Sequence, residues 1–551
     1  MNFKYTILAL FSISLLSCTD GFENDNRNPN NPEFVPTYGI YNNATKELVG
    51  ITNRGSFGSA RMTLPWVQYS AQLTYTEEDR YEYRRETPLN IFDNYYRQAN
   101  NFKKIIETVE DPKYTDITAT YGNNDVQIAV SRIMIAYTFQ QLVDMFGDIP
   151  YWSYGNKNPD FQALDIDNIS PKYATQEDIY TDLLNELKEA VVTLEDSGES
   201  NIFYATQTYI GENLFNNDVE KLIKFANSLR LRIANRVKNT SLSSIATTHI
   251  SEVIASGKIM LNNNDSVGIQ YEDNSVNPAP QYSAFFIDNR TDYTVSKTFV
   301  DLLKGELPNS GLIDPDPRLQ QVVAPKGVGK QISLQNQYTS VYSTNKDTLN
   351  KYYQGMPFGI PNSITGSQKG SGNSNISMFG HAIFKPNYTE YLMEYAEVEF
   401  ILSEIKGWDP NNYEYGVRAS MQKWGVNTTE IDTYIANLPV ANQENVLTQK
   451  YIALFMQPYE AWSEYRRTGF PNFLIKPGDQ VELINPVDGS LTYTFQITAT
   501  ARSINGNMTD LPARIRYPYT ESTLNKTNYE AAVSRLGGDT MQQTLIWDRN
   551  H

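Results

Sequence analysis

Apolar residues recur every three or four positions in several long stretches, and this spacing most limits what the chain can fold into. The stretches are residues 126–146, 177–194, 219–237, 388–405 and 447–465. In the first of them, Ile135, Phe139, Leu142 and Phe146 fall on one side of a helix. We therefore predict a mainly α fold. No repeat of fixed length is evident, so the spacing alone predicts helices that pair with one another and no particular helical-repeat architecture.

The segments between these helices have a different character. Gly147 and Pro150 follow the first predicted helix, and both residue types are typical of a helix end. Residues 262–292 and 355–380 are rich in Asn, Ser, Gly and Pro, which predicts long loops. Within residues 485–507 the alternation Thr-Tyr-Thr-Phe-Gln-Ile-Thr predicts a short strand. Long loops on a helical scaffold are where we expect a ligand to bind.

The N-terminus is typical of an exported lipoprotein. Lys4 is followed by an apolar run, and residues 15–18 read Leu-Leu-Ser-Cys, with Cys18 the sole cysteine of the chain. The alternatives are an ordinary secretory signal with a chance cysteine, or a membrane helix, for which the run is too short. We predict a signal peptide over residues 1–17, an acylated Cys18 that begins a flexible tether over residues 18–36, and one domain over residues 37–551.

Composition limits the function further. The chain has a formal net charge of −17 and 40% hydrophobic residues, which is a globular and acidic composition. An acidic balance argues against nucleic acid as a partner and against electrostatic docking on an anionic membrane. With Cys18 acylated, no thiol remains for a disulfide, so we expect packing alone to stabilise the fold.

Few residues of the chain suit metal binding or proton transfer. Its three histidines, His249, His381 and His551, lie far apart in the sequence, and there is no phosphate-binding glycine loop. The acidic run at residues 314–318 has the composition of a calcium patch, but its two prolines favour a rigid turn. We predict no metal, no cofactor and no catalytic residue. A surface hydrolase remains a less favoured alternative, because it needs only two carboxyl groups close together.

Aromatic residues are abundant, with 38 Tyr, 24 Phe and 6 Trp, and two loop stretches combine them with arginine. Flat aromatic faces cover apolar sugar faces, and arginine binds hydroxyl or carboxylate oxygens. The alternative is that these residues pack the loops. The stretches are residues 66–85 and 282–293. The ligand-binding candidates that we name in them are Trp66, Tyr75, Arg80, Tyr81, Tyr83, Tyr282, Phe286, Arg290 and Tyr293.

A series of motifs then resembles one family. They run in order from Tyr137-Thr-Phe-Gln-Gln-Leu-Val-Asp-Met-Phe-Gly-Asp-Ile-Pro-Tyr151 to the terminal Ile546-Trp-Asp548, by way of residues 171–180, 224–234, 316–318, 394–400, 449–455, 460–469 and 512–518. Together they resemble the SusD/RagB family of nutrient-binding outer-membrane lipoproteins, in the branch called SusD-like 2. The residues of most of these motifs are of kinds that pack helices, so we expect the motifs to define the fold and not to contact a ligand. We expect Arg230 and Arg232 to pair with carboxylates of neighbouring helices, and Trp462 to pack among ion pairs.

The resemblance implies a fold of tetratricopeptide-like helix pairs that carries a loop-rich ligand face and a few short strands. It implies a protein on the outer surface of the outer membrane that captures a nutrient for a SusC-type TonB-dependent transporter, without catalysis. The family's substrates are oligosaccharides in many members and peptides in some. We predict oligosaccharide capture, with oligopeptide capture as the alternative; a surface hydrolase or a purely structural surface protein is less favoured.

Overall fold

The computed structural model describes residues 34–50, 58–204, 212 and 214–549. The predicted signal peptide, the acylated Cys18 and the tether up to residue 33 lie outside the described residues. Over the described ranges, no helix has both the length and the apolar character needed to cross a membrane.

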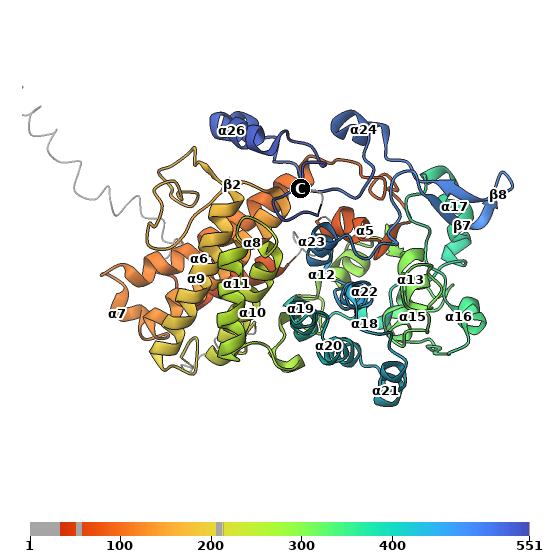
Figure 1. The fold of residues 1–551 in the computed structure, drawn as a ribbon, viewed down its shortest axis with the longest axis horizontal. Coiled ribbons are helices and arrows are strands. Elements are labelled where there is room, and N and C mark those ends of the chain that lie inside the picture. The colour runs from red at the N-terminus through yellow and green to blue at the C-terminus, as the bar shows by residue number, and fades with distance from the viewer. Residues whose placement is uncertain (1–33, 51–57, 205–211, 213, 550–551) are drawn as a thin grey trace, which may run out of the picture.

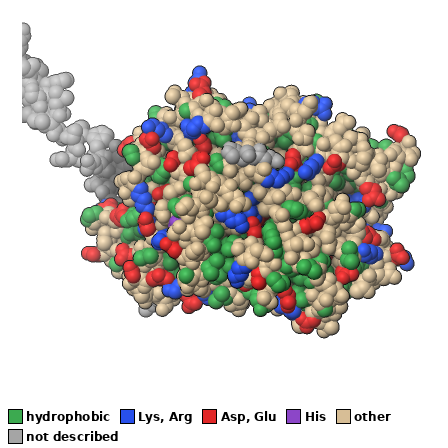
Figure 2. Space-filling model, viewed as in Figure 1, with side chains coloured by type: hydrophobic (Ala, Val, Ile, Leu, Met, Phe, Trp, Pro, Cys, Tyr) green, Lys and Arg blue, Asp and Glu red, His purple; other side chains and the backbone are tan. Residues whose placement is uncertain are grey.

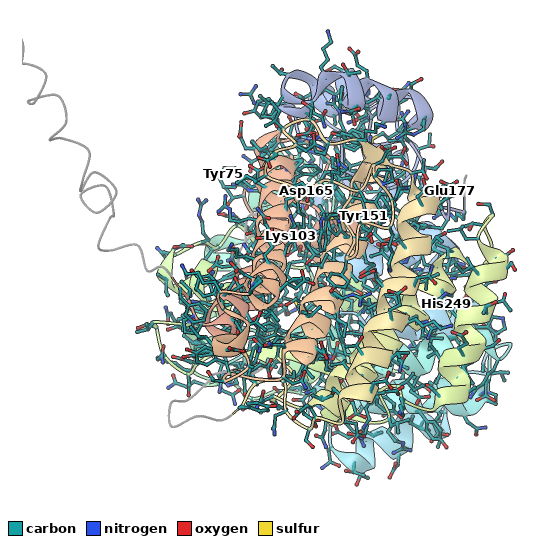
Figure 3. The ribbon with its side chains drawn as sticks, turned by 90° about the vertical axis from the view of Figure 1, so that its left-hand side faces the viewer. Tyr75, Lys103, Tyr151, Asp165, Glu177 and His249 are labelled. Carbon is teal, nitrogen blue, oxygen red and sulfur yellow. The ribbon has the colours of Figure 1, made fainter. Side chains whose placement is uncertain are left out.

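One half of the molecule is a stack of long helices (Figures 1 and 3). In chain order each of these helices packs against the next. They are α3 (Thr37–Val49), α6 (Glu86–Glu110), α8 (Asn124–Phe146), α9 (Gln176–Ser197), α10 (Val219–Val237) and α11 (Ser243–Ser256). Figure 3 shows this stack from the side, with Tyr75 at one edge of the view and His249 towards the other. The predicted mainly α fold of paired helices is confirmed.

Helix α8 lies at the centre of the stack, and its sequence sets both of its ends. The side chain of Asn123 accepts hydrogen bonds from the backbone N–H groups of Asp125 and Val126, which begins the helix. Gly147 follows the last turn with a φ of 85°, a value that favours glycine, so the predicted helix end is confirmed. Nearly every side chain of α8 is buried, because α6 and α9 pack against it on either side.

A second group of helices forms the C-terminal part of the scaffold. It comprises α19 (Tyr395–Ile405), α20 (Pro410–Lys423), α21 (Thr428–Ala436), α22 (Gln443–Ala453) and α23 (Pro458–Thr468). Helices α19 to α22 enclose a small hydrophobic core of their own around Phe400, Val417 and Val446. Helix α10 packs against α19 and so joins this group to the first stack.

Two predicted helices are shorter or divided in the structure. The stretch 388–405 begins as strand β6 (Thr389–Met393), which pairs antiparallel with β4 (Val267–Gln270), and only then becomes α19. The stretch 447–465 divides into α22 and α23. Met456 has a φ of 70° at the break, and Pro458 begins the second helix because it has no N–H to continue the first.

The predicted strand within residues 485–507 is also partly confirmed. Strand β8 (Ser490–Thr494) pairs antiparallel with β7 (Gln480–Val487). The chain leaves the strand after Thr494 and forms α24 (Ala499–Asn505), which the alternating pattern did not predict. Two further antiparallel pairs are β1 (Ser70–Gln72) with β5 (Tyr293–Val295), and β2 (Ile149–Pro150) with β3 (Tyr173–Ala174).

The loop-rich part of the chain carries many short helices. Those before α19 are α5 (Thr63–Trp66), α7 (Thr115–Thr118), α12 (Pro280–Tyr282), α13 (Lys297–Leu303), α14 (Leu319–Val322), α15 (Lys330–Leu334), α16 (Lys346–Tyr352), α17 (Asn362–Lys369) and α18 (His381–Phe384). Near the C-terminus lie α25 (Glu521–Leu524) and α26 (Lys526–Leu536). Helices α13, α15, α16 and α17 gather on the side of the molecule away from α6 and α7 (Figure 1).

Candidate functional site

Strands β1 and β5 bring the two aromatic stretches together, although more than 200 residues separate them in the chain. Gln72 lies opposite Tyr293 in this antiparallel pair. Just beyond it, the backbone N–H groups of Leu73 and Thr74 both donate to the carbonyl oxygen of Asp292, at 2.5 and 3.0 Å. The stretches that we predicted separately therefore form one local structure.

A shallow, open recess lies where the two stretches meet, and we call it the first recess. Tyr75, Arg290 and Tyr293, three of the predicted ligand-binding residues, line it together with Ala60, Arg61, Gln72, Glu78 and Asp292. Tyr75 has a side chain that is 45% exposed, and Arg61 and Arg290 are 29% and 36% exposed. The recess thus offers an aromatic face to an incoming molecule. Two guanidinium groups lie beside it, that of Arg290 at 3.3 Å from Asp292 and that of Arg61 at 3.8 Å from Glu78.

The backbone around this recess adopts uncommon conformations. Gln68, Tyr75 and Tyr81 have φ values of 55°, 59° and 61°, in the left-handed region that large side chains rarely adopt. Such residues are found where the surrounding structure imposes them, and they cluster at ligand sites. At Tyr75 this conformation accompanies a large ring left open to solvent, which is what a binding platform requires.

A second shallow recess adjoins the first and shares Arg61 and Glu78 with it. Two more predicted residues, Trp66 and Tyr83, line it, with Glu82, Arg84 and Arg516 among the others. Trp66 is largely buried, since its ring meets that of Trp462 edge-on with centroids 5.2 Å apart. Tyr83 is half-buried under the guanidinium of Arg516, which lies 4.9 Å from its ring centre.

The carboxyl groups beneath the two recesses are unusual. Glu78 is buried, and this burial raises its pKa to about 7, although the nearby guanidinium groups of Arg84 and Arg61 act in the opposite direction. The next residue, Asp79, is fully buried, and burial raises its pKa to about 8 against the hydrogen bonds from the backbone N–H groups of Gln72 and Gly359. Perturbed carboxyl groups of this kind are typical of functional sites.

The remaining predicted residues lie outside the two recesses. Tyr81 is fully buried, with its ring 5.5 Å from that of Phe495, so it belongs to the hydrophobic core. Arg80 is 3.8 Å from Glu77. Tyr282 and Phe286 form an aromatic pair with centroids 5.2 Å apart on the segment that leads to Arg290. Of the nine predicted residues, five line the two recesses and four do not.

Five residues of the first recess were not among the predicted ones: Ala60, Arg61, Gln72, Glu78 and Asp292, of which three are charged. Arg61 lies outside both aromatic stretches, in a Gly- and Ser-rich segment whose composition did not mark it as part of a site. Glu78 and Asp292 fall within the stretches, and the β1–β5 pairing brings them to the same recess. The raised pKa of Glu78 depends on burial, which the sequence does not reveal.

A larger polar hollow of about 1240 Å³ lies near α10 and the C-terminal segment, lined by Arg236, Arg467, Trp547 and others. Its arginines already have buried partners: Arg236 pairs with Asp144 and Glu460, and Arg467 lies 2.7 Å from Glu404 and 2.8 Å from Glu464. These guanidinium groups serve the helix packing. We place the ligand site at the first recess because it lies where the two predicted aromatic stretches meet and carries the exposed ring of Tyr75.

The acidic run at residues 314–318 is a turn. Asp316 accepts hydrogen bonds from the backbone N–H of Arg318, at 2.9 Å, and from the guanidinium of the same residue, at 2.6 Å. Both side chains are buried, so the arginine takes the place that a cation would need. Among the described residues, no cluster of three His, Cys, Asp or Glu side chains could hold a metal ion.

The chain is similar to a known family and to several solved structures. The model of the family SusD-like_2, described as "Starch-binding associating with outer membrane", matches residues 29–487. No curated protein matches the chain. Its fold is similar to that of a chitin-binding SusD homologue from Flavobacterium johnsoniae, with a TM-score of 0.66 and 22% identity over 94% of this chain and 99% of that one.

Two further structures have the same fold. A SusD homologue from Parabacteroides distasonis is 23% identical with a TM-score of 0.69, over 93% of this chain and 98% of that one. A SusD homologue from Bacteroides fragilis is 21% identical with a TM-score of 0.67, over 93% and 99% of the two chains. At these identities the likeness establishes the fold alone.

Proposed function

Because the chain belongs to the SusD-like_2 family, whose description is starch-binding and associated with the outer membrane, we propose that it is a cell-surface protein that captures oligosaccharides. Acylated Cys18 anchors it to the outer membrane, facing the exterior, and a SusC-type TonB-dependent transporter receives the captured ligand. The protein binds and does not catalyse. A chitin-binding homologue of the same fold supports a carbohydrate ligand over a peptide.

The observation that carries this proposal is the position of Tyr75. Its exposed ring stands at the rim of the first recess, beside the guanidinium groups of Arg61 and Arg290. A sugar ring has an apolar face that an aromatic ring covers and hydroxyl groups that arginine can bind, so this combination suits an oligosaccharide. Tyr75 therefore provides the stacking surface, and the two arginines fix the orientation of the ligand.

Calorimetric titration of the protein from residue 19 onwards tests the proposal. Neutral and acidic oligosaccharides of several lengths, and a set of mixed peptides, are titrated separately. We expect binding to oligosaccharides, and Tyr75→Ala should weaken it about tenfold, because a central aromatic contact is often worth more than 1 kcal/mol. The matched control is Tyr415→Ala on α20, whose side chain is 49% exposed and lines neither recess.

The other outcomes point to other functions. Binding to peptides alone would replace the oligosaccharide with an oligopeptide and keep the capture role. Hydrolysis of any oligosaccharide, lost on Glu78→Gln, would contradict a binding protein and favour a surface hydrolase. Loss of binding in Tyr415→Ala and not in Tyr75→Ala would place the ligand elsewhere on the molecule.

A further inference from the structure

Aromatic contacts fix the point at which the described chain begins. The ring of Phe34 meets those of Tyr114 and Tyr121, with centroids 5.3 and 6.1 Å apart. These two tyrosines lie directly before and shortly after α7, at the left-hand side of Figure 1. Tyr38 then meets Tyr121 edge-on at 5.5 Å, so the chain enters α3 along this end of the helix stack. The segment that leads back to Cys18 therefore starts beside α7.

The distance that this segment can span is small compared with the molecule. Cys18 and Phe34 are sixteen positions apart. Sixteen residues reach at most about 55 Å, even when fully extended. A folded chain of about 500 residues is roughly 60 Å across. With a lipid on Cys18, the side of the molecule around α7 is therefore the side nearest the membrane.

A long loop, residues 151–172, lies on this same side and connects β2 with β3. Tyr154, near its start, donates to the carboxylate of Glu110 at the end of α6, at 2.7 Å. Lys103, two turns earlier on α6, donates to the carboxylate of Asp165, at 2.9 Å. Figure 3 views the molecule from its α7 side and labels Lys103 and Asp165. The loop thus lies along α6, close to where the described chain begins.

This loop presents two apolar side chains to solvent. Ile166 is 94% exposed and Ile169 is 87% exposed. Hydrogen bonds fix the turn that carries them: the backbone N–H of Asn168 donates to the carbonyl oxygen of Asp165, at 3.0 Å, and its side chain donates to that of Gln162, at 2.9 Å. Because the turn is already formed, a partner can cover both isoleucines without the cost of ordering the loop.

A third exposed apolar side chain comes from the segment of α25 and α26. Leu524 is 72% exposed, and the next residue, Asn525, donates to the carbonyl oxygen of Pro171, at 2.7 Å. Asn528 likewise donates to the carbonyl oxygen of Ser170, at 2.9 Å. The end of the loop and this helical segment therefore form one surface, which we call the loop surface and define by Ile166, Ile169 and Leu524. Grouped exposed apolar side chains mark contacts with proteins or membranes.

Charge favours a protein as the partner of the loop surface. Asp167 lies between the two isoleucines and is exposed. An exposed carboxylate disfavours an anionic membrane surface and favours a protein that offers a basic side chain. On the face of the molecule shown in Figure 2, acidic and basic side chains are interspersed, so no single charge dominates that face.

We propose that the protein docks on its transporter through the loop surface, and that the transporter offers an apolar hollow with a basic residue at the rim. This inference rests on the proposed function, which supplies the lipid on Cys18 and the transporter. Ile166 and Ile169 fill the hollow, Leu524 covers its edge, and Asp167 pairs with the basic residue. The short span from Cys18 keeps the two surfaces close together and so raises their effective concentration.

Photo-crosslinking in the outer membrane of the cells that produce the protein tests this inference. In the full-length chain, benzoylphenylalanine replaces Ile166 or Ile169, and each adduct is identified by mass spectrometry. The control positions are Tyr352 on α16 and Leu491 on β8, which are 42% and 53% exposed and lie on the side away from α7 (Figure 1). We expect adducts with a TonB-dependent transporter from the two loop positions and none from the control positions.

Charge substitutions provide a second measurement. Ile166→Asp with Ile169→Asp should reduce the amount of co-purified transporter at least about tenfold, because central apolar contacts carry much of the affinity of an interface. The affinity for oligosaccharides should stay within about twofold and the unfolding midpoint should not change, since both side chains are exposed. The matched control is Ile313→Asp with Val440→Asp, in the connections before α14 and α22, which are 73% and 82% exposed. It should retain the transporter.

Three results would overturn the inference and keep the proposed function. They are adducts of the loop positions with lipid, adducts with a second copy of this chain, and adducts with the transporter from the control positions alone. Full retention of the transporter by the variant with Ile166→Asp and Ile169→Asp would overturn it as well. A transporter found neither in an adduct nor with the purified wild type would overturn the transporter of the proposed function itself, whereas calorimetry tests oligosaccharide capture separately.

Discussion

The guanidinium of Arg232 on α10 donates two hydrogen bonds of 2.6 Å each to the carboxylate of Glu397 on α19. The two side chains are 2% and 1% exposed, so the pair is buried where the first helix stack meets the C-terminal helices. The same guanidinium also donates to the carbonyl oxygen of Leu392, at 3.2 Å, in strand β6. One arginine of the 224–234 motif thus joins three elements that are distant in sequence.

Removing one member of this pair should destabilise the protein strongly. In Arg232→Met the carboxyl group of Glu397 stays buried without its partner, and burial already raises its pKa. Breaking a buried ion pair in this way costs about 3–5 kcal/mol, which urea unfolding followed by circular dichroism can measure. The control is Arg418→Met, which breaks a surface pair with Asp432 and should cost less than about 1 kcal/mol.

The double variant Arg232→Met with Glu397→Leu separates charge from packing. Because it leaves no unpaired charge in the core, it should unfold at a higher urea concentration than Arg232→Met alone. If the double variant is the less stable of the two, the pair contributes through its shape and not through its charge.

Much of the scaffold follows from the spacing of apolar residues. The stretch 219–237 forms a helix over the predicted residues, and Gly147 ends α8 where a positive φ was expected. The motifs at residues 224–234 and 460–469 supply buried ion pairs, as with Arg232 and Glu397, and Trp462 packs with Arg466 3.4 Å above its ring. Helix periodicity is a local signal, so a single sequence carries it. The motifs mark the charged residues, but the fold decides which of them pair, since Arg232 and Glu397 lie far apart in the chain.

The points where predicted helices are divided or shortened, and the residues of the candidate site, depend on contacts between distant segments. Residues 389–393 satisfy a helical pattern, yet they form a strand because β4 lies beside them. The aromatic stretches contain Tyr81, whose ring is in the core, and Tyr75, whose ring is open to solvent, and composition does not distinguish them. Arg61 joins the site only because residues around it fold onto the β1–β5 pair, which no local pattern indicates.

Cys18→Ala should release the protein from the membrane, since the lipid on this cysteine is the proposed anchor. Membrane fractionation and mass spectrometry of the mature protein test this, with Ser17→Ala as the control, because alanine suits the residue before the cleaved bond. A Cys18→Ala protein that remains acylated and in the membrane fraction would contradict the lipoprotein prediction.

Two substitutions of Tyr81 distinguish a core residue from a ligand contact. Its ring is fully buried, and its hydroxyl group has no hydrogen-bond partner among the described residues. Tyr81→Ala should therefore cost about 3–5 kcal/mol of stability, whereas Tyr81→Phe should leave stability equal or higher, because an unpaired buried hydroxyl is removed. Thermal unfolding measures both. Weaker ligand binding by a fully folded Tyr81→Phe would instead give the hydroxyl a role at the site.

The stability of the folded state should fall as pH rises towards 8, and Asp79 should account for part of the fall. Burial raises the pKa of Asp79 from 3.8 to about 8, and that of Glu78 from 4.5 to about 7. Between the unfolded and folded pKa values, the folded protein holds a proton that the unfolded chain has released. The stabilising contribution of the carboxyl group is therefore complete below the unfolded pKa and is lost as pH rises through the folded pKa.

Asp79→Asn keeps an oxygen to accept from the N–H of Gln72 and does not ionise, so it should lose less stability than the wild type between about pH 5 and pH 8. Thermal unfolding across this range measures the difference, with the exposed Asp167→Asn as the control. Parallel pH profiles for the wild type and Asp79→Asn would show that the carboxyl group of Asp79 stays ionised in the folded protein.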